Sequence, residues 1–215
     1  SKLPTYLAIY PEWFPDWATS GIVGPERFRA HLDLNTICGG PDMMVYPASW
    51  SHVRPESAPA TADSSLTRLH LRDSLDLAWL ADERRHHWVA IPEAKDVLRR
   101  YVFAGLASSA PVADGGRIVR GVQRFQATVQ AGRDVVLVLR TDAWYPTRLS
   151  VSVDGKPAGT WSIALAETAW VEPQFTIPGR LVTRTRPEIA LTREAEPDGN
   201  ETGRDYSAFR FWLYQ

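Results

Sequence analysis

The chain has 215 residues, of which 44% are hydrophobic and 23% are charged, so it can bury a core as one large domain or two small ones. The net charge is −1, and no long basic run occurs, which argues against nucleic acid as a partner. A single cysteine, Cys38, excludes an internal disulfide, and no signal peptide or apolar run long enough to span a bilayer is evident.

The first part of the chain predicts short strands separated by turns. Alternating or continuous apolar residues predict strands at residues 6–10, 28–34, 43–46 and 66–71. The stretch 52–65 is rich in Pro, Ala and Ser, which is typical of a loop or a domain boundary. We therefore expect N-terminal strands and aromatic loops over residues 1–60 and a β-sandwich over 61–215, with one continuous domain over 1–215 as the alternative.

The middle of the chain alternates between strands and polar stretches. Residues 73–87 (DSLDLAWLADERRHH) predict a short helix or a loop, because Leu77 and Leu80 stand at helical spacing. Strands are expected at 88–91 and 98–103, and a loop at 110–116.

The clearest pattern lies between Gly132 and Trp170. Residues 135–139 (VVLVL) form an apolar run, typical of a strand that is covered on both faces. Residues 149–153 alternate with period two, and Asp154-Gly155 supplies a turn, so an antiparallel hairpin is expected to continue to Trp161.

The last ten residues, YSAFRFWLYQ, also alternate and predict an aromatic strand in the middle of a sheet. Together the patterns predict roughly ten to thirteen strands and one or two short helices. The expected fold class is all-β, an antiparallel β-sandwich of jelly-roll type.

Several motifs in order resemble a known family. The motifs are LAIYPEW (7–13), NTICGG (35–40), VYPASW (45–50), DSLDLAWLADERRH (73–86), GRIVRGVQRF (116–125), LVLRT (137–141), VSVDG (151–155), WVEPQFTIP (170–178) and the aromatic end (209–215). Their order resembles the soluble C-terminal region of bacterial polytopic membrane glycosyltransferases that use lipid-linked sugar donors.

The resemblance implies an extracytoplasmic β-sandwich similar to a carbohydrate-binding module, on the periplasmic or cell-surface side of a bacterial membrane. Its implied partners are a glycan or lipid-linked sugar and the membrane portion of the same polypeptide, where the transferase chemistry would lie. One departure concerns Gln123, because the resemblance leads us to expect an acidic residue in the segment 121–125.

The richest polar cluster lies at residues 73–87. On a helix, Asp82 and His86 would share one face, as would Glu83 and His87. Such pairs can bind a metal or act as acid and base, but the spacing matches no metalloenzyme motif, so a structural network is the favoured interpretation. A functional site here would use His86, supported by Asp76 and Glu83. The metal is left open, and calcium is allowed only by fold analogy.

A second candidate site follows the central apolar strand. Trp144 and Tyr145 come after Arg140 and Asp142, and loop aromatics flanked by polar groups are what a sugar site needs. Trp144 can instead cap the end of the sandwich. Glu172 completes the candidate set, although pairing with an arginine is its favoured interpretation.

Three functions remain open at this point. The first is a non-catalytic carbohydrate-binding or accessory domain that positions glycan for a membrane glycosyltransferase. The second is a free-standing carbohydrate-active hydrolase or lyase that uses His86 with Asp76 and Glu83. The third is a structural sandwich for protein interaction, in which every Trp would be buried.

Overall fold

The computed structural model describes residues 59–61, 64–106, 111–142, 144–165, 169–194 and 205–215. The strands predicted at 6–10, 28–34 and 43–46 lie outside these residues, as does Cys38. The proposed division at residue 60 therefore stays a prediction.

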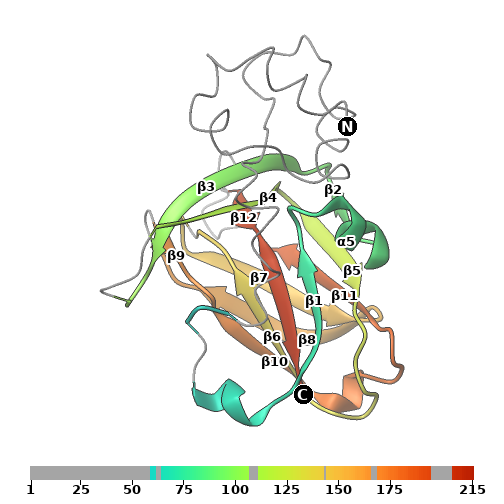
Figure 1. Ribbon diagram of the computed structural model, residues 1–215. Helices are drawn as coiled ribbons and strands as arrows, with labels where there is room; N and C mark the ends of the chain where they lie inside the picture. Colours follow the sequence, from blue (N-terminus) through green and yellow to red (C-terminus); the bar gives the residue numbers. More distant parts are fainter. Residues whose placement is uncertain (1–58, 62–63, 107–110, 143, 166–168, 195–204) are drawn as a thin grey trace, which may run out of the picture.

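Two antiparallel sheets face each other and form a β-sandwich (Figure 1). The four-stranded sheet has the order β1-β13-β6-β10, with strands Leu71–Asp76, Arg210–Tyr214, Val135–Arg140 and Gln174–Ile177. The five-stranded sheet has the order β2-β5-β11-β7-β8, with strands Val89–Ile91, Val122–Gln126, Glu188–Arg193, Thr147–Val153 and Lys156–Ile163. The predicted all-β antiparallel sandwich is confirmed.

A third sheet, also four-stranded, lies over one end of the sandwich, where β3 arches across the molecule (Figure 1). Its order is β12-β4-β3-β9, with strands Tyr206–Ala208, Val112–Val119, Lys95–Phe103 and Ala169–Trp170. The β3–β9 pair is parallel, whereas the other two pairs are antiparallel. Val97, Phe103, Trp170 and Phe209 form a separate apolar cluster there.

The main core fills the space between the two sheets of the sandwich. Leu137 and Leu139 of β6 and Phe211 and Leu213 of β13 are completely buried in it. On the opposite face of the β1-β13-β6-β10 sheet, Val138 and Trp212 belong to a second apolar cluster with Leu66 and Tyr214. β6 and β13 are therefore covered on both faces, as the apolar run 135–139 predicted for β6. β13 lies in the interior of its sheet, as the alternating aromatic end of the chain predicted.

The hairpin of β7 and β8 closes at Asp154 and Gly155, which have φ angles of 48° and 77°. Positive φ at both central residues matches the twist of the paired strands, so this predicted turn is confirmed.

Two local predictions were wrong. Residues 66–71 do not form one strand, because the 3₁₀ helix η2 (Ser64–Arg68) turns there and places Leu66 against Trp212 before β1 begins. Residues 112–116 belong to β4 rather than to a loop. Glycine is required at position 116 of this strand, because a Cβ atom there would lie only 2.3 Å from the carbonyl oxygen of Ala208. Gly116 therefore reflects close packing of two backbones and not a turn.

The stretch 73–87 divides between a strand and a helix. It supplies most of β1 and then the short helix α5 (Leu80–Arg85).

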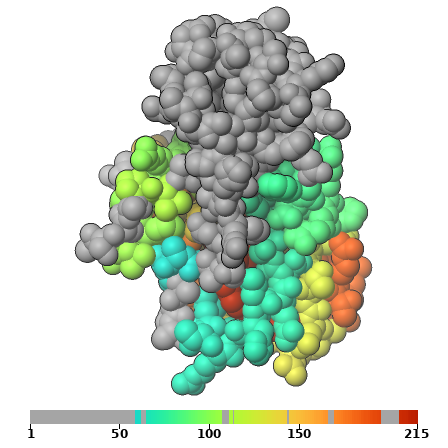
Figure 2. Space-filling model, in the orientation of Figure 1, coloured from blue at the N-terminus to red at the C-terminus, as the bar shows by residue number. Residues whose placement is uncertain are grey.

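A second 3₁₀ helix, η3 (Gly179–Leu181), follows β10. In the space-filling view, η2 and β1 lie at the surface (Figure 2). The Thr128 N–H of the loop after β5 donates a hydrogen bond to Asp73 of β1. Within the described residues, no helix is long and apolar enough to cross a membrane.

Candidate functional site

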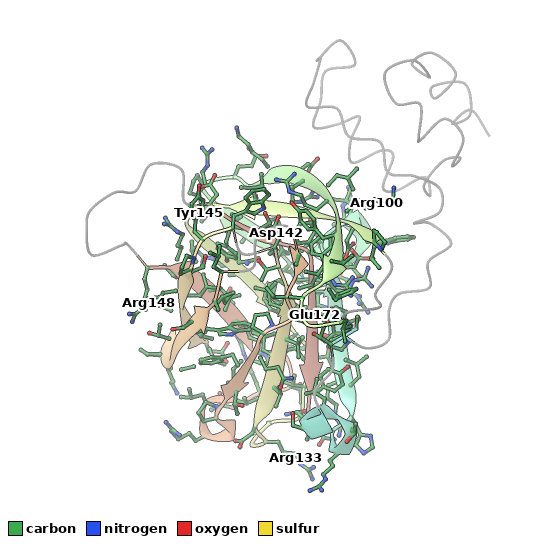
Figure 3. The ribbon with its side chains drawn as sticks, turned by 90° about the vertical axis from the view of Figure 1, so that its left-hand side faces the viewer. Arg100, Arg133, Asp142, Tyr145, Arg148 and Glu172 are labelled. Carbon is green, nitrogen blue, oxygen red and sulfur yellow. The ribbon has the colours of Figure 1, made fainter. Side chains whose placement is uncertain are left out.

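The exposed aromatic pair lies on the loop that joins β6 to β7. Trp144 is 43% exposed and Tyr145 is 48% exposed, whereas the other tryptophans in the described part of the chain are buried or half-buried. Figure 3 shows Tyr145 near Asp142 at the end of the sandwich opposite Arg133. The alternative function, a structural sandwich for protein interaction, required every Trp to be buried, and the exposure of Trp144 does not meet this requirement.

Asp142 lies beneath this pair and is only 1% exposed. Its Oδ2 atom accepts a hydrogen bond from Trp144 Nε1 at 3.1 Å and another from Arg99 Nε at 3.2 Å. Arg99 and Tyr101 both come from β3. The structure therefore places Asp142 in contact with Trp144, the neighbour of Tyr145, and adds two residues from a distant part of the sequence. Because Asp142 is buried, it contacts the aromatic loop from below and is not itself an exposed sugar-binding group.

Tyr101 links the exposed loop to the core below it. Its ring meets Trp170 edge to face, with 5.3 Å between the ring centroids. Burial raises the pKa of the Tyr101 phenol, which opposes the lowering by Arg99 and by the hydrogen bond with Trp144. The phenol is thus neutral at physiological pH and can donate or accept a hydrogen bond.

Arg140 and Glu172 do not belong to the exposed patch. Arg140 is completely buried, and its Nε and Nη2 atoms donate to Glu172 Oε1 at 3.0 and 2.8 Å. Its Nη1 atom donates to Asp114 Oδ2 at 2.9 Å. The prediction that Arg140 contacts a sugar is therefore wrong, because its three nitrogens donate to the buried carboxylates of Glu172 and Asp114.

Arg140 and Glu172 form part of a charged row across one end of the β1-β13-β6-β10 sheet. Asp76, Arg210 and Arg140 are successive partners on β1, β13 and β6. Two arginines opposite each other would repel, but carboxylates separate their charges. Asp76 accepts from Arg210 at 2.9 Å, and Asp114 lies 2.9 Å from Arg140 and 3.9 Å from Arg210.

The row also binds Thr61, which lies in the first described segment of the chain. Glu172 Oε2 accepts hydrogen bonds from the backbone N–H and the hydroxyl of Thr61, at 2.7 and 2.8 Å. Glu172 thus pairs with an arginine, as its favoured interpretation expected, and also binds residue 61. It acts as an internal bridge and not as a surface group.

The predicted polar cluster around His86 is divided among separate partners. His86 is 2% exposed, with Nδ1 at 2.7 Å from the Asp82 carbonyl oxygen and Nε2 at 3.2 Å from Asp73 Oδ1. Glu83 lies 2.8 Å from Arg117 Nε. Burial raises the pKa of Glu83, although Arg117 opposes this effect.

His86, Asp76 and Glu83 therefore do not form one acid–base set. Each meets a different partner, and the contact of His86 with Asp82 uses the backbone carbonyl instead of the carboxylate that helical spacing suggested. Among the described residues, no group of three or more His, Cys, Asp or Glu side chains could hold a metal ion. Calcium stays a prediction and enters no further step.

Asp73 gives this cluster a defined pH dependence. Burial alone would raise the pKa of Asp73, but hydrogen bonds from His86 and from the N–H groups of Thr128 and Ser74 lower it below its ordinary value. A carboxyl whose pKa is lowered by folding stabilises the fold above its unfolded pKa, and this stabilisation is lost as the pH falls through its folded pKa.

We therefore expect the unfolding free energy to fall below about pH 4 with a smaller slope in Asp73→Asn than in the wild-type chain. Urea unfolding at pH 6, 4 and 3 measures this slope. Asp205→Asn, which alters an exposed ion pair with Arg120, serves as the control. Equal slopes for the wild type and Asp73→Asn would contradict the prediction.

Gln123, where the resemblance led us to expect an acid, is completely buried. Its Oε1 atom accepts from Trp88 Nε1 at 2.9 Å, and its Nε2 atom donates to the Tyr206 hydroxyl at 2.6 Å. Burial raises the pKa of Tyr206 far above its ordinary value. An amide meets both needs here, since an ionised carboxylate could not donate.

The sequence matches no protein-family profile and no curated protein. Solved structures with similar folds include a carbohydrate-binding module of Cellvibrio mixtus lichenase 5A in complex with cellotriose. It has 9% identity and a TM-score of 0.40, and the match covers 68% of this chain and 98% of that chain.

Two further matches are carbohydrate-binding modules. A family 6 module from Clostridium cellulolyticum in complex with xylose has 8% identity and a TM-score of 0.38, covering 66% of this chain and 97% of its own. A family 35 module from Clostridium thermocellum has 14% identity and a TM-score of 0.34, covering 59% and 95%.

Proposed function

We propose that this chain is a non-catalytic carbohydrate-binding domain whose site is the end of the sandwich at Trp144 and Tyr145. The observation that carries the proposal is a pair of exposed aromatic rings beside a buried carboxylate and a partly exposed arginine. Flat rings stack on the apolar faces of sugars, and planar polar groups bind the hydroxyls.

The wider context is proposed from the sequence motifs alone. They support an accessory role in a bacterial membrane glycosyltransferase, on the extracytoplasmic side of the membrane. The domain would position a glycan acceptor or a lipid-linked sugar for the membrane portion of the same polypeptide. Co-purification of the full-length gene product with membranes, and binding of glycan by its soluble part, would test this context.

The buried arrangement of His86 gives the hydrolase alternative no support. Both of its ring nitrogens meet protein acceptors, and Glu83 and Asp76 pair with different arginines. A general acid or base must reach the substrate proton that it transfers. That alternative therefore ranks behind the binding function.

A glycan array tests the proposal directly. The intact chain is applied with and without calcium, and binding of each hit is followed by intrinsic Trp fluorescence while the products are analysed for cleavage. Saturable binding without turnover supports the proposal. Turnover of a glycan would overturn its non-catalytic part, and no binding to any glycan would overturn it entirely.

Trp144→Ala should weaken binding to an array hit by roughly 1–2 kcal/mol and leave the melting temperature nearly unchanged. The reason is that an exposed stacking ring contributes to binding and little to the core. Isothermal titration calorimetry and thermal unfolding measure the two quantities. Ile91→Ala, which shortens an exposed apolar side chain on β2, is the control. A Trp144→Ala chain that unfolds would show that this ring belongs to the core.

A further inference from the structure

Trp144 is exposed to solvent, but one edge of its ring is held by a hydrogen bond. Its ring is 43% exposed, yet its Nε1–H donates to Asp142 Oδ2 at 3.1 Å. An exposed tryptophan normally samples several rotamers, and stacking a ligand on it then carries the entropic cost of ordering the side chain. A hydrogen bond at the ring edge removes part of this freedom before any ligand arrives.

The acceptor of this hydrogen bond is itself held in place. Asp142 is 1% exposed, and the same Oδ2 atom also accepts from Arg99 Nε at 3.2 Å. Arg99 Nη1 donates to the carbonyl oxygen of Leu98 at 3.2 Å, which ties the guanidinium to β3. The carboxylate is thus fixed between β3 of the third sheet and the segment that follows β6 of the sandwich.

We infer that Asp142 and Arg99 are positioning residues that hold the Trp144 ring ready for a sugar. The ring is the stacking surface, Asp142 anchors its edge, and Arg99 orients and neutralises the buried carboxylate. This inference rests on the proposed function. Arg99 also has one nitrogen, Nη2, with no hydrogen-bond partner in the described part of the chain, and a planar N–H group of this kind can donate to a sugar hydroxyl.

The ordering of the ring can be measured without a ligand. In the ¹⁵N-labelled intact chain, the indole N–H signal of Trp144 is assigned by its loss in Trp144→Phe, and its heteronuclear NOE reports the motion of the ring. We expect a rigid indole in the wild type and a mobile one in Asp142→Leu and Arg99→Met. Asp142→Asn should keep the ring rigid, because its amide oxygen still accepts from Nε1.

Affinity for the tightest-binding neutral trisaccharide of the array gives the second readout. Asp142→Leu and Arg99→Met should each weaken it by up to about tenfold, which corresponds to the cost of ordering one side chain. Arg120→Met is the matched control. Arg120 also pairs with an aspartate, Asp205, at 3.0 Å, but its side chain is 52% exposed. Arg99→Met keeps the test valid if Asp142→Leu does not fold.

The outcomes separate the two hypotheses. A ring that stays rigid in both Asp142→Leu and Arg99→Met would overturn the positioning role. An affinity loss no greater than that of Arg120→Met would overturn it as well. A ring that becomes mobile while Trp144→Ala leaves glycan binding intact would support the anchoring of the indole and overturn the proposed function of the site.

Discussion

Arg140→Met is expected to lower the free energy of unfolding by about 3–5 kcal/mol, because it leaves buried carboxylates without their counter-charge. Arg140 is completely buried and donates to both Glu172 and Asp114. Methionine can fill much of the space of the arginine stem, so the loss would come mainly from the orphaned charges. Urea unfolding at pH 7 measures the effect.

The matched control for this prediction is Arg120→Met, which breaks the exposed pair with Asp205 and should cost less than about 1 kcal/mol. Adding Glu172→Gln to Arg140→Met should recover part of the loss, since one of the uncompensated charges is then removed. Equal stability of Arg140→Met and Arg120→Met would contradict the structural role given to this charged row.

Trp170→Ala is expected to cost about 3–5 kcal/mol, as is typical when a buried aromatic ring is removed. Trp170 is completely buried, meets Phe209 edge to face at 4.5 Å between centroids, and supports Tyr101 beneath the exposed patch. Its Nε1 atom also donates to the carbonyl oxygen of Val112 at 2.9 Å. Thermal and urea unfolding of the intact chain measure the loss.

Trp170→Phe distinguishes the contribution of the buried ring to stability from that of its hydrogen bond. It keeps most of the apolar contact but leaves the Val112 carbonyl without this donor, so it should cost less than Trp170→Ala. Trp170→Ala should also weaken glycan binding through Tyr101, even under conditions where the variant is folded. A Trp170→Ala variant as stable as the wild type would show that the third sheet packs differently from the structure described above.

The fold was largely predictable because its signals are local. The apolar run at 135–139 and the aromatic end of the chain predicted interior strands, and both are covered on two faces. Asp154 and Gly155 predicted their hairpin through backbone preferences alone. The errors arose where tertiary packing decided the conformation: Gly116 is demanded by the close approach of Ala208, which no local pattern reveals.

The exposed part of the site was also predictable, since Trp144 and Tyr145 are adjacent and follow a strong strand. Arg99 and Tyr101 were missed because they reach the site from β3, about forty residues earlier, through a sheet pairing that the sequence does not encode locally. Asp76, Arg140 and Glu172 were singled out as chemistry-bearing residues. Their convergence into one buried row depends on strand register, so the sequence suggested their importance but not their structural role.

β6 is paired on both sides, with β13 and β10, and its last residue is held by the charged row. The loop that carries the exposed rings begins just beyond that residue. Changes in the loop aromatics are therefore separated from the folding of the sandwich, which depends on the strands before the loop. Under the proposed function, substitutions of these aromatics would change which sugar is bound while the framework stays the same.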